Sequence, residues 1–283
     1  MREDFAVFIL CYGRPNRCKT LHTLKRCNYT GKYYLVLSTD DVTLNDYISN
    51  FGKEHILIFD KNDIKADRMD NFNNKKCVMY ARNACFKLAK QVDVRYFLEL
   101  DDDYTEIRYR WNKNGSLTSH FCLNADELFE SMIDLLNSGN NLYSIAFAQA
   151  GDFIGGVDCQ MLRDNTSIRK IMNSFFCDIN KPFDFIGTFN EDVNTYTQLQ
   201  STGKTFLTVR NVAINQLDTQ QQSGGMTEIY NAFGTYVKSF YTILCSPSCV
   251  KLNVMGDLHY RIHHNVKWNN AIPKIISSKY KKN

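Results

Sequence analysis

The sequence has few residues of the kind that mark linkers and no segment that marks a membrane protein. Only four prolines occur in 283 residues, and no internal repeat or low-complexity stretch interrupts the chain. No apolar run approaches the ~18 residues that a membrane-spanning helix needs. Residues 1–4 lead directly into an apolar segment, without the features of a secretory signal. We therefore expect one large cytoplasmic domain, because a chain of this length can fold around a single core.

Cysteine is not scarce, but its spacing lacks the patterns of disulfide frameworks and zinc sites. The ten cysteines include no Cys-x-x-Cys pair, and the closest two are Cys245 and Cys249. Cys11, Cys77 and Cys85 lie in apolar patterns, where cysteine acts as a small core residue. In an intracellular chain we predict reduced, buried thiols rather than disulfides or zinc ligands.

Acidic residues are almost absent from the end of the chain. Residues 256–283 carry slightly more positive charge than the whole chain, whose formal net charge is +4. Residues 1–255 are therefore nearly neutral. Such a basic segment is either a solvated terminus or a contact to a phosphate backbone. Residues 256–283 contain one acid, Asp257, and six basic residues: Arg261, Lys267, Lys274, Lys279, Lys281 and Lys282.

The main feature that is present is an apolar strand ending in three carboxylates. Residues 96–100 read Tyr-Phe-Leu-Glu-Leu and are followed by Asp101, Asp102 and Asp103. Aspartate is a poor strand residue and is costly to bury unpaired. Three in a row place at least two on one side of a turn, and Mg²⁺ or Mn²⁺ binds such oxygens, usually together with a phosphate. A solvated acidic turn is the alternative.

Other apolar strands surround this motif and alternate with helical patterns. Strand-like runs occur at residues 5–11, 33–37 and 55–59, and residues 74–90 carry apolar side chains at helical spacing. This alternation predicts an α/β fold with a mixed, mostly parallel sheet flanked by helices. Asn114-Gly115 predicts the turn of a hairpin. Polar residues follow several strands, so we expect ligand groups along one edge of the sheet.

The second half of the chain contains an acidic pair and a histidine pair. Glu191 and Asp192 precede a helical pattern at residues 193–200, although the helix dipole alone favours acids there. His263 and His264 accompany a predicted strand. Because adjacent strand residues point to opposite faces, only one of them would reach a metal ion, and we favour His263.

This ordered series resembles the GT-A-type nucleotide-sugar glycosyltransferases over about residues 5–265. The resemblance implies that the first strand leads into a nucleotide-contacting loop, here with Tyr12 and Arg14. Acids after the second strand, here Asp40 or Asp41, would contact the base or ribose. The Ala-Arg-Asn helix would contribute Arg82 as a donor contact.

The same resemblance implies a metal site and a catalytic base. Asp101 and Asp103 form the DxD motif that would hold Mn²⁺ or Mg²⁺, and Asp101 would also contact the donor. One residue of the pair His263 and His264 would be a further metal ligand. The base would be Asp192, with Glu191 as the alternative, and Gly203 follows at the usual distance.

A narrower resemblance is to the TET/JBP-associated glycosyltransferases of bacteriophages and some eukaryotes. It implies a UDP-sugar donor, a hydroxymethylated pyrimidine in double-stranded DNA as acceptor, a donor contact from Asp70, and a location in the host cytoplasm for a phage-encoded enzyme. The residues that carry it are Asp67, Asp70-Asn71-Phe72, Arg82-Asn83, Leu100–Tyr104, Gly224-Gly225 and His263–Trp268.

The residues leave three alternatives open. The acceptor can be a saccharide or a protein; the acids can form a two-metal phosphoryl-transfer or nuclease site; or the chain can be a non-catalytic nucleotide-binding module. For the glycosyltransferase we expect a single GT-A-like domain over residues 1–283. About 1–109 would bind the nucleotide-sugar, about 110–265 would bind the acceptor and hold the base, and 266–283 would be a basic segment.

Overall fold

The computed structural model describes residues 1–65, 75–163, 171–216, 234, 236–256 and 260–271. Within these residues, nine strands form one sheet in the order β3-β2-β1-β4-β8-β7-β9-β5-β6. Their bounds are β1 (Phe5–Leu10), β2 (Lys32–Ser38), β3 (Ile56–Phe59), β4 (Tyr96–Asp101), β5 (Tyr104–Lys113), β6 (Ser116–Phe121), β7 (Leu142–Gln149), β8 (Ser174–Asp178) and β9 (Thr205–Gln216).

The sheet is mixed, which confirms the predicted α/β class. The pairings among β3, β2, β1 and β4 are parallel, as is the pairing of β7 with β9, whereas β8 runs antiparallel to both β4 and β7. Strands β5 and β6 continue the sheet in antiparallel fashion beyond β9. The N-terminal half therefore has the parallel βα order that the apolar runs predicted, and the second half does not.

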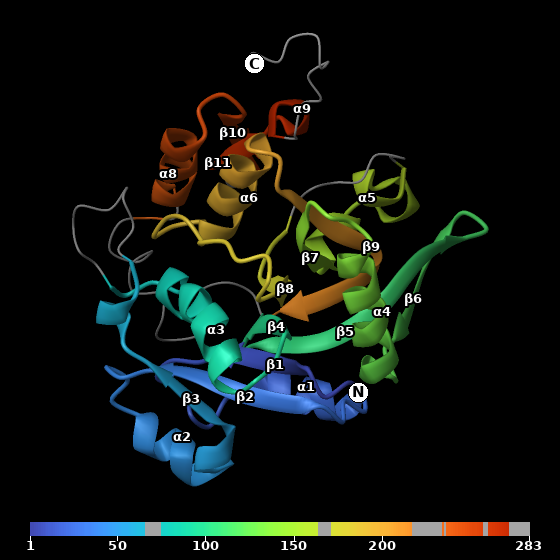
Figure 1. Ribbon diagram of the computed structural model, residues 1–283. Helices are drawn as coiled ribbons and strands as arrows, with labels where there is room; N and C mark the ends of the chain where they lie inside the picture. Colours follow the sequence, from blue (N-terminus) through green and yellow to red (C-terminus); the bar gives the residue numbers. More distant parts are fainter. Residues whose placement is uncertain (66–74, 164–170, 217–233, 235, 257–259, 272–283) are drawn as a thin grey trace, which may run out of the picture.

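Helices cover both faces of this sheet (Figure 1). The main helices are α1 (Lys19–Arg26), α2 (Leu44–Phe51), α3 (Met79–Gln91), α4 (Ala125–Asn137), α6 (Glu191–Ser201) and α8 (Val237–Cys245). Shorter ones are α5 (Gln160–Arg163), α9 (Trp268–Ala271) and the 3-10 turns η1 (Lys53–His55), η2 (Lys61–Asp63), η3 (Ala150–Phe153) and η4 (Gly156–Asp158). Among the described helices, none combines the length and apolar character that crossing a lipid bilayer requires.

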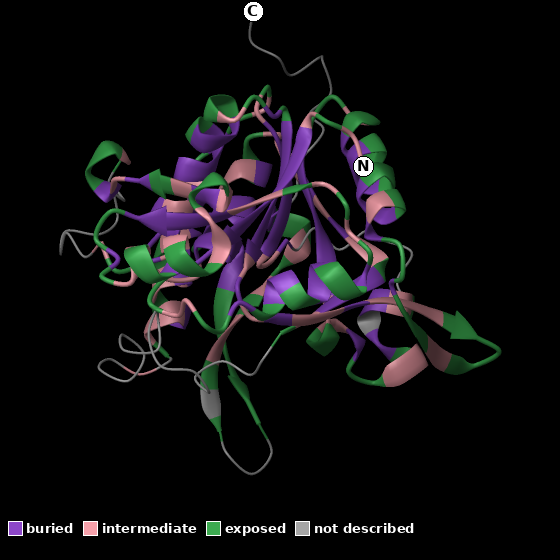
Figure 2. Cartoon of the chain, turned by 90° about the horizontal axis from the view of Figure 1, so that it is seen from below, coloured by how far each residue is buried: buried purple, intermediate pink, exposed green. Residues whose placement is uncertain are grey.

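Alternation along β1 divides the core into two layers. Phe5, Val7 and Ile9 pack in a cluster with α1, α2 and α4, whereas the intervening residues pack with α3 and α6. This is the pattern of a strand covered on both faces, because successive side chains point to opposite sides. Figure 2 shows the result as buried central strands with exposed outer helix faces.

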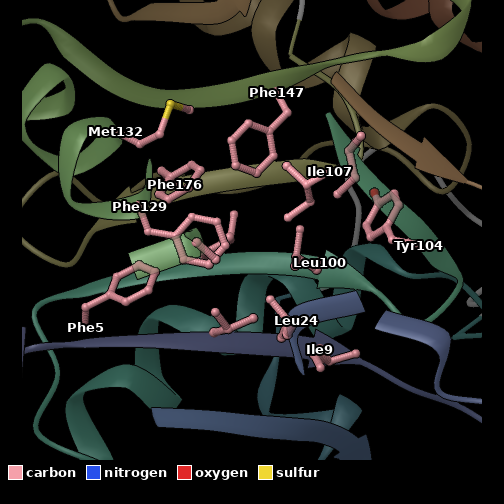
Figure 3. Close-up of a cluster of buried hydrophobic side chains, with 14 of the residues drawn as sticks. Phe5, Ile9, Leu24, Leu100, Tyr104, Ile107, Phe129, Met132, Phe147 and Phe176 are labelled. Carbon is pink, nitrogen blue, oxygen red and sulfur yellow. The ribbon is translucent and has the colours of Figure 1, made fainter. Parts of the chain in front are cut away.

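The first cluster supports the end of β4. Phe176 stacks on Phe5 with ring centroids 6.2 Å apart and meets Phe147 edge-on at 5.3 Å. Leu100 and Tyr104 belong to the same cluster (Figure 3). Since Leu100 precedes the three aspartates and Tyr104 follows them, apolar packing fixes both sides of the acidic turn.

Two hairpins extend this architecture. The predicted turn is confirmed: Asn114 (φ 52°) and Gly115 (φ 82°) both occupy the left-handed region and join β5 to β6, as a two-residue Asn-Gly turn requires. A separate two-stranded sheet consists of β10 (Val250–Met255) and β11 (Arg261–Val266). Nine of the ten cysteines are buried, as predicted, and no two of the ten are bonded to each other.

Candidate active site

The three aspartates after β4 point to three different partners. Asp101 Oδ1 accepts a hydrogen bond from Arg82 Nη2 at 3.0 Å. Asp102 Oδ1 forms an ion pair with Arg14 Nη2 at 2.9 Å and has a side chain only 2% exposed. Asp103 Oδ2 accepts a bond of 3.3 Å from Gln216 Nε2 at the end of β9. The turn therefore connects the loop after β1, helix α3 and the end of β9.

Two of these carboxylates each have one oxygen that accepts no hydrogen bond from the described residues. Asp102 Oδ2 and Asp103 Oδ1 are buried without a hydrogen-bond partner among the described residues. Burial, followed by repulsion from Asp101, raises the pKa of Asp103 to about 6. Burial also raises the pKa of Asp102 to about 7, although Arg14 opposes this rise. The turn thus has the electrostatic character of a site that favours a proton or a cation.

Arg82 connects this turn to helix α6. Its guanidinium is buried, with the side chain 1% exposed, and contacts Glu191 Oε1 at 3.0 Å and Glu99 Oε2 at 3.6 Å in addition to Asp101. Although burial opposes it, the carboxylates of Asp101, Glu191 and Glu99 raise the pKa of Arg82. Burial raises the pKa of Glu99 to about 8, so Glu99 is largely protonated at neutral pH. Burial also raises the pKa of Glu191 to about 7, although Arg82 opposes this rise. Arg82 therefore holds Asp101 and Glu191 in place through direct contacts.

The predicted nucleotide loop is tied to the loop after β2. Asp41 is buried and accepts hydrogen bonds from the Gly13 amide at 2.9 Å and from the amide and hydroxyl of Thr43 at 2.8 and 2.7 Å. Asp40 is half-exposed and pairs with Lys61 Nζ at 2.9 Å. Lys61 in turn lies 4.9 Å from the ring centroid of Tyr12. The two neighbouring acids thus differ: Asp41 orders the loop, and Asp40 faces the surface.

We expect Asp41→Ala to lower the free energy of unfolding by about 1–3 kcal/mol, because it removes a buried carboxylate that accepts three hydrogen bonds from Gly13 and Thr43. Asp40→Ala is the matched control. It removes an ion pair between the half-exposed Asp40 and Lys61, whose side chain is 9% exposed, and we expect it to cost up to about 1 kcal/mol. Urea unfolding of both variants measures the difference. Equal losses would contradict a structural role specific to Asp41.

Helix α6 begins at the proposed base and is anchored by Asn190. Asn190 adopts a left-handed conformation (φ 51°), and its side-chain amide contacts Thr242 Oγ1 at 2.9 Å and His264 Nδ1 at 3.3 Å. Asp192 is 5% exposed, and its Oδ1 accepts a bond of 2.7 Å from the Val193 amide. The start of α6 is therefore connected to α8 and β11 as well as to Arg82.

The structure brings some candidate residues together and leaves others apart. Asp101, Arg82 and Glu191 form one contact network, and Arg14 joins it through the acidic turn. His264, rather than the favoured His263, lies against Asn190. Among the described residues, no three His, Cys, Asp or Glu side chains are grouped as a metal site, so neither histidine completes a protein-only set with Asp101 and Asp103. Asp70, Asp67 and Gly224-Gly225 lie outside the described residues.

Sequence reasoning missed three contributors to this site: Glu99, Lys61 and Gln216. A signal existed for Glu99, because it is a charged residue inside an otherwise apolar strand. No local pattern indicated Gln216, whose contact depends on β9 lying beside β5. Arg82 was expected as a donor contact, but the structure surrounds its guanidinium with carboxylates and places the rings of Phe175 and Phe185 against it.

Three comparisons with known proteins bear on this geometry. The sequence model described as TET-Associated Glycosyltransferase matches residues 5–225. A search of curated proteins finds no match. Among solved structures, glucosyl-3-phosphoglycerate synthase from Mycobacterium tuberculosis with Mn²⁺ and UDP-glucose is 8% identical, with a TM-score of 0.47 over 97% of this chain and 88% of that chain. A mycobacterial protein is 6% identical, with a TM-score of 0.46 over 93% of this chain and 84% of that chain.

Proposed function

The chain belongs to the TET-associated glycosyltransferase family, whose sequence model covers most of it, and from this premise we propose that it moves a sugar from a nucleoside-diphosphate donor to an acceptor hydroxyl. The glycosyltransferase resemblance is thereby confirmed at the level of the family. The donor we propose is a UDP-sugar, the metal is Mn²⁺ or Mg²⁺, and the acceptor is a hydroxymethylated pyrimidine in double-stranded DNA. The acidic turn at residues 101–103 is the observation that carries this proposal.

The acidic turn fits a divalent cation that is shared with a diphosphate. Asp103 Oδ1 is buried and accepts no hydrogen bond from the described residues, and Asp101 repels it electrostatically. Mg²⁺ and Mn²⁺ sites commonly use one or two carboxylates and take their remaining ligands from substrate phosphates and water. Asp101 and Asp103 would hold the ion, and His263 or His264 remains a proposed additional ligand. When bound, the ion would neutralise the diphosphate leaving group.

The surrounding residues divide into positioning residues and a base. Arg82 fixes Asp101 on one side and Glu191 on the other, which supports a positioning role rather than direct donor binding. Arg14, paired with Asp102, orders the loop that carries Tyr12. Glu191 is already engaged in the buried ion pair, so Asp192 is the better candidate to accept the proton of the acceptor hydroxyl.

The positive charge near β10 and β11 supports the proposed DNA acceptor. Lys251 and Lys267 lie at the base of the β10–β11 hairpin and line a shallow depression together with Asn253 and Asn265. In the sequence, residues 246–283 contain only one acid. A polyanion such as DNA matches this composition. We also propose a cytoplasmic location, in keeping with ten free thiols.

A product assay tests this function. The protein is incubated with Mn²⁺, a panel of UDP-sugars and duplex DNA containing hydroxymethylpyrimidine, and the nucleosides are analysed by mass spectrometry while UDP release is recorded. We expect a mass increase of one sugar on the modified base. Transfer only to a saccharide or peptide would reject the DNA acceptor. DNA cleavage without UDP release would favour a two-metal phosphoryl-transfer enzyme instead.

A further inference from the structure

The β5–β6 hairpin is a long ribbon that starts directly at the acidic turn. Strand β5 begins at Tyr104, immediately after Asp103, and pairs with β6 from Arg108↔Phe121 to Lys113↔Ser116. Figure 1 shows this ribbon reaching beyond the helices at the side of the molecule. At about 3.3 Å per residue, ten residues span about 33 Å. The ribbon therefore connects the proposed metal site with a region well outside it.

The ribbon carries an excess of positive charge. Residues 104–121 contain Arg108, Arg110 and Lys113 but only one acid, Glu106. Glu106 is already engaged by Arg108 Nε at 3.1 Å and by Asn215 Nδ2 at 2.9 Å. The one carboxylate of this segment therefore pairs with Arg108, and no acid of the segment remains for Arg110 and Lys113.

The excess of positive charge on the ribbon affects Arg110 in particular. It lies two residues after Arg108 and therefore on the same face of the strand. Its Nε is buried without a hydrogen-bond partner among the described residues, and its guanidinium lies 4.9 Å from the ring centroid of Phe153. Burial, and then repulsion from Arg108, lowers the pKa of Arg110. An external anion at the exposed part of the guanidinium would offset the repulsion from Arg108.

Aromatic side chains accompany the cations. Trp111 and His120 stack across the two strands at 5.1 Å, and Arg108 lies 3.8 Å from the ring centroid of Phe121, which is 50% exposed. Lys113 is exposed near the turn. Because successive strand residues point to opposite faces, Trp111, Lys113 and His120 lie on one face of the ribbon and Arg108, Arg110 and Phe121 on the other. Each face therefore combines a cation with an aromatic ring, which suits contacts with phosphates, sugars and bases.

We propose that the β5–β6 ribbon is the arm that docks on the acceptor duplex, with Arg110 and Lys113, which lie on opposite faces of the ribbon, contacting the backbone phosphates on the two sides of the groove. This inference rests on the proposed DNA acceptor. A two-stranded ribbon fits the major groove of B-form DNA, and the six paired residues on each strand span roughly 20 Å along such a groove. Since β5 starts directly after Asp103, a duplex held by the ribbon has a fixed register relative to the proposed metal site.

Binding to duplex DNA tests the ribbon without requiring turnover. Fluorescence anisotropy with a labelled duplex is measured at several salt concentrations for wild type, for Arg110→Gln combined with Lys113→Gln, and for Lys87→Gln combined with Lys90→Gln. The last pair removes the same charge from two exposed positions on α3. Each lost phosphate contact lowers the log–log salt slope by about 0.9, so the ribbon variant should lose about 1.8 in slope and, near 0.1 M salt, about 10- to 100-fold in affinity.

Donor hydrolysis, recorded as UDP release without acceptor, tests the proposed function separately from the ribbon inference. The ribbon variant should hydrolyse the donor at the wild-type rate, which also shows that it is folded. If it binds the duplex as tightly as the α3 variant does, the ribbon inference is wrong and the proposed function stands. If wild type releases no UDP from any donor, the proposed function fails, and the binding comparison still decides about the ribbon. If wild type does not bind a duplex, the ribbon inference is overturned.

Discussion

Asp103→Ala should abolish metal-dependent sugar transfer and leave the fold intact. Asp103 has a buried oxygen without a hydrogen-bond donor, so its removal does not break a structural contact on that side, but it deletes a ligand of the proposed ion. The loss of such a ligand costs several kcal/mol of transition-state stabilisation, or about 10³-fold or more in rate. UDP release and Mn²⁺ binding in the presence of UDP are the measurements.

Asp134→Ala is the control for this variant, since Asp134 is an exposed acid on the solvent side of α4. It should retain wild-type transfer and metal binding. Circular dichroism should show the same fold for both proteins. Undiminished wild-type turnover in excess chelator would remove the metal from the mechanism, and with it the role of Asp101 and Asp103.

Asp192→Asn should lower the rate of transfer by about 10²- to 10⁴-fold while donor affinity survives. The substitution keeps size and the capacity to accept a hydrogen bond from the Val193 amide, but it removes basicity. General-base catalysis contributes rate factors of this size. Comparing kcat with the dissociation constant for UDP separates chemistry from binding.

Glu191→Gln distinguishes the two acids at the start of α6. Its carboxylate is bound to Arg82, so we expect this variant to disturb Arg82 and the position of Asp101, which raises the requirement for Mn²⁺. If Glu191→Gln loses transfer with normal Mn²⁺ dependence while Asp192→Asn stays active, the roles are exchanged. If both variants remain active, the base lies elsewhere in the chain.

Local sequence patterns were sufficient to predict the N-terminal strands, one hairpin turn and the acidic turn. The apolar runs located β1 to β4 within one or two residues, and Asn114-Gly115 located a turn because few dipeptides accept left-handed conformations at both positions. The helix expected at residues 74–90 begins at Met79 within the described residues. The acidic turn was recognisable because three aspartates cannot continue a buried strand.

The features that were not predicted, namely β9, most of β5 and the contacts of Arg82, depend on residues that are far apart in the sequence. Strand β9 was missed, because its apolar residues neither alternate regularly nor form one continuous run. Its neighbour β5 was only partly seen, because Arg108 and Arg110 gave its end the polarity of a loop. The contacts of Arg82 with Glu99 and Glu191 join residues on three separate elements, and no spacing rule links them. The choice between His263 and His264 likewise depended on which face of β11 meets Asn190.

The position of β8 beside β4 has a consequence for the synthesis of this protein. Strand β4 ends at residue 101, but its antiparallel partner occupies residues 174–178. At usual translation rates the ribosome needs roughly several seconds to make the intervening segment. During that interval an apolar edge of the nascent sheet has no neighbour, and such edges invite pairing between chains. Yield in a heterologous host is therefore expected to depend on growth temperature and on chaperones that shield the emerging chain.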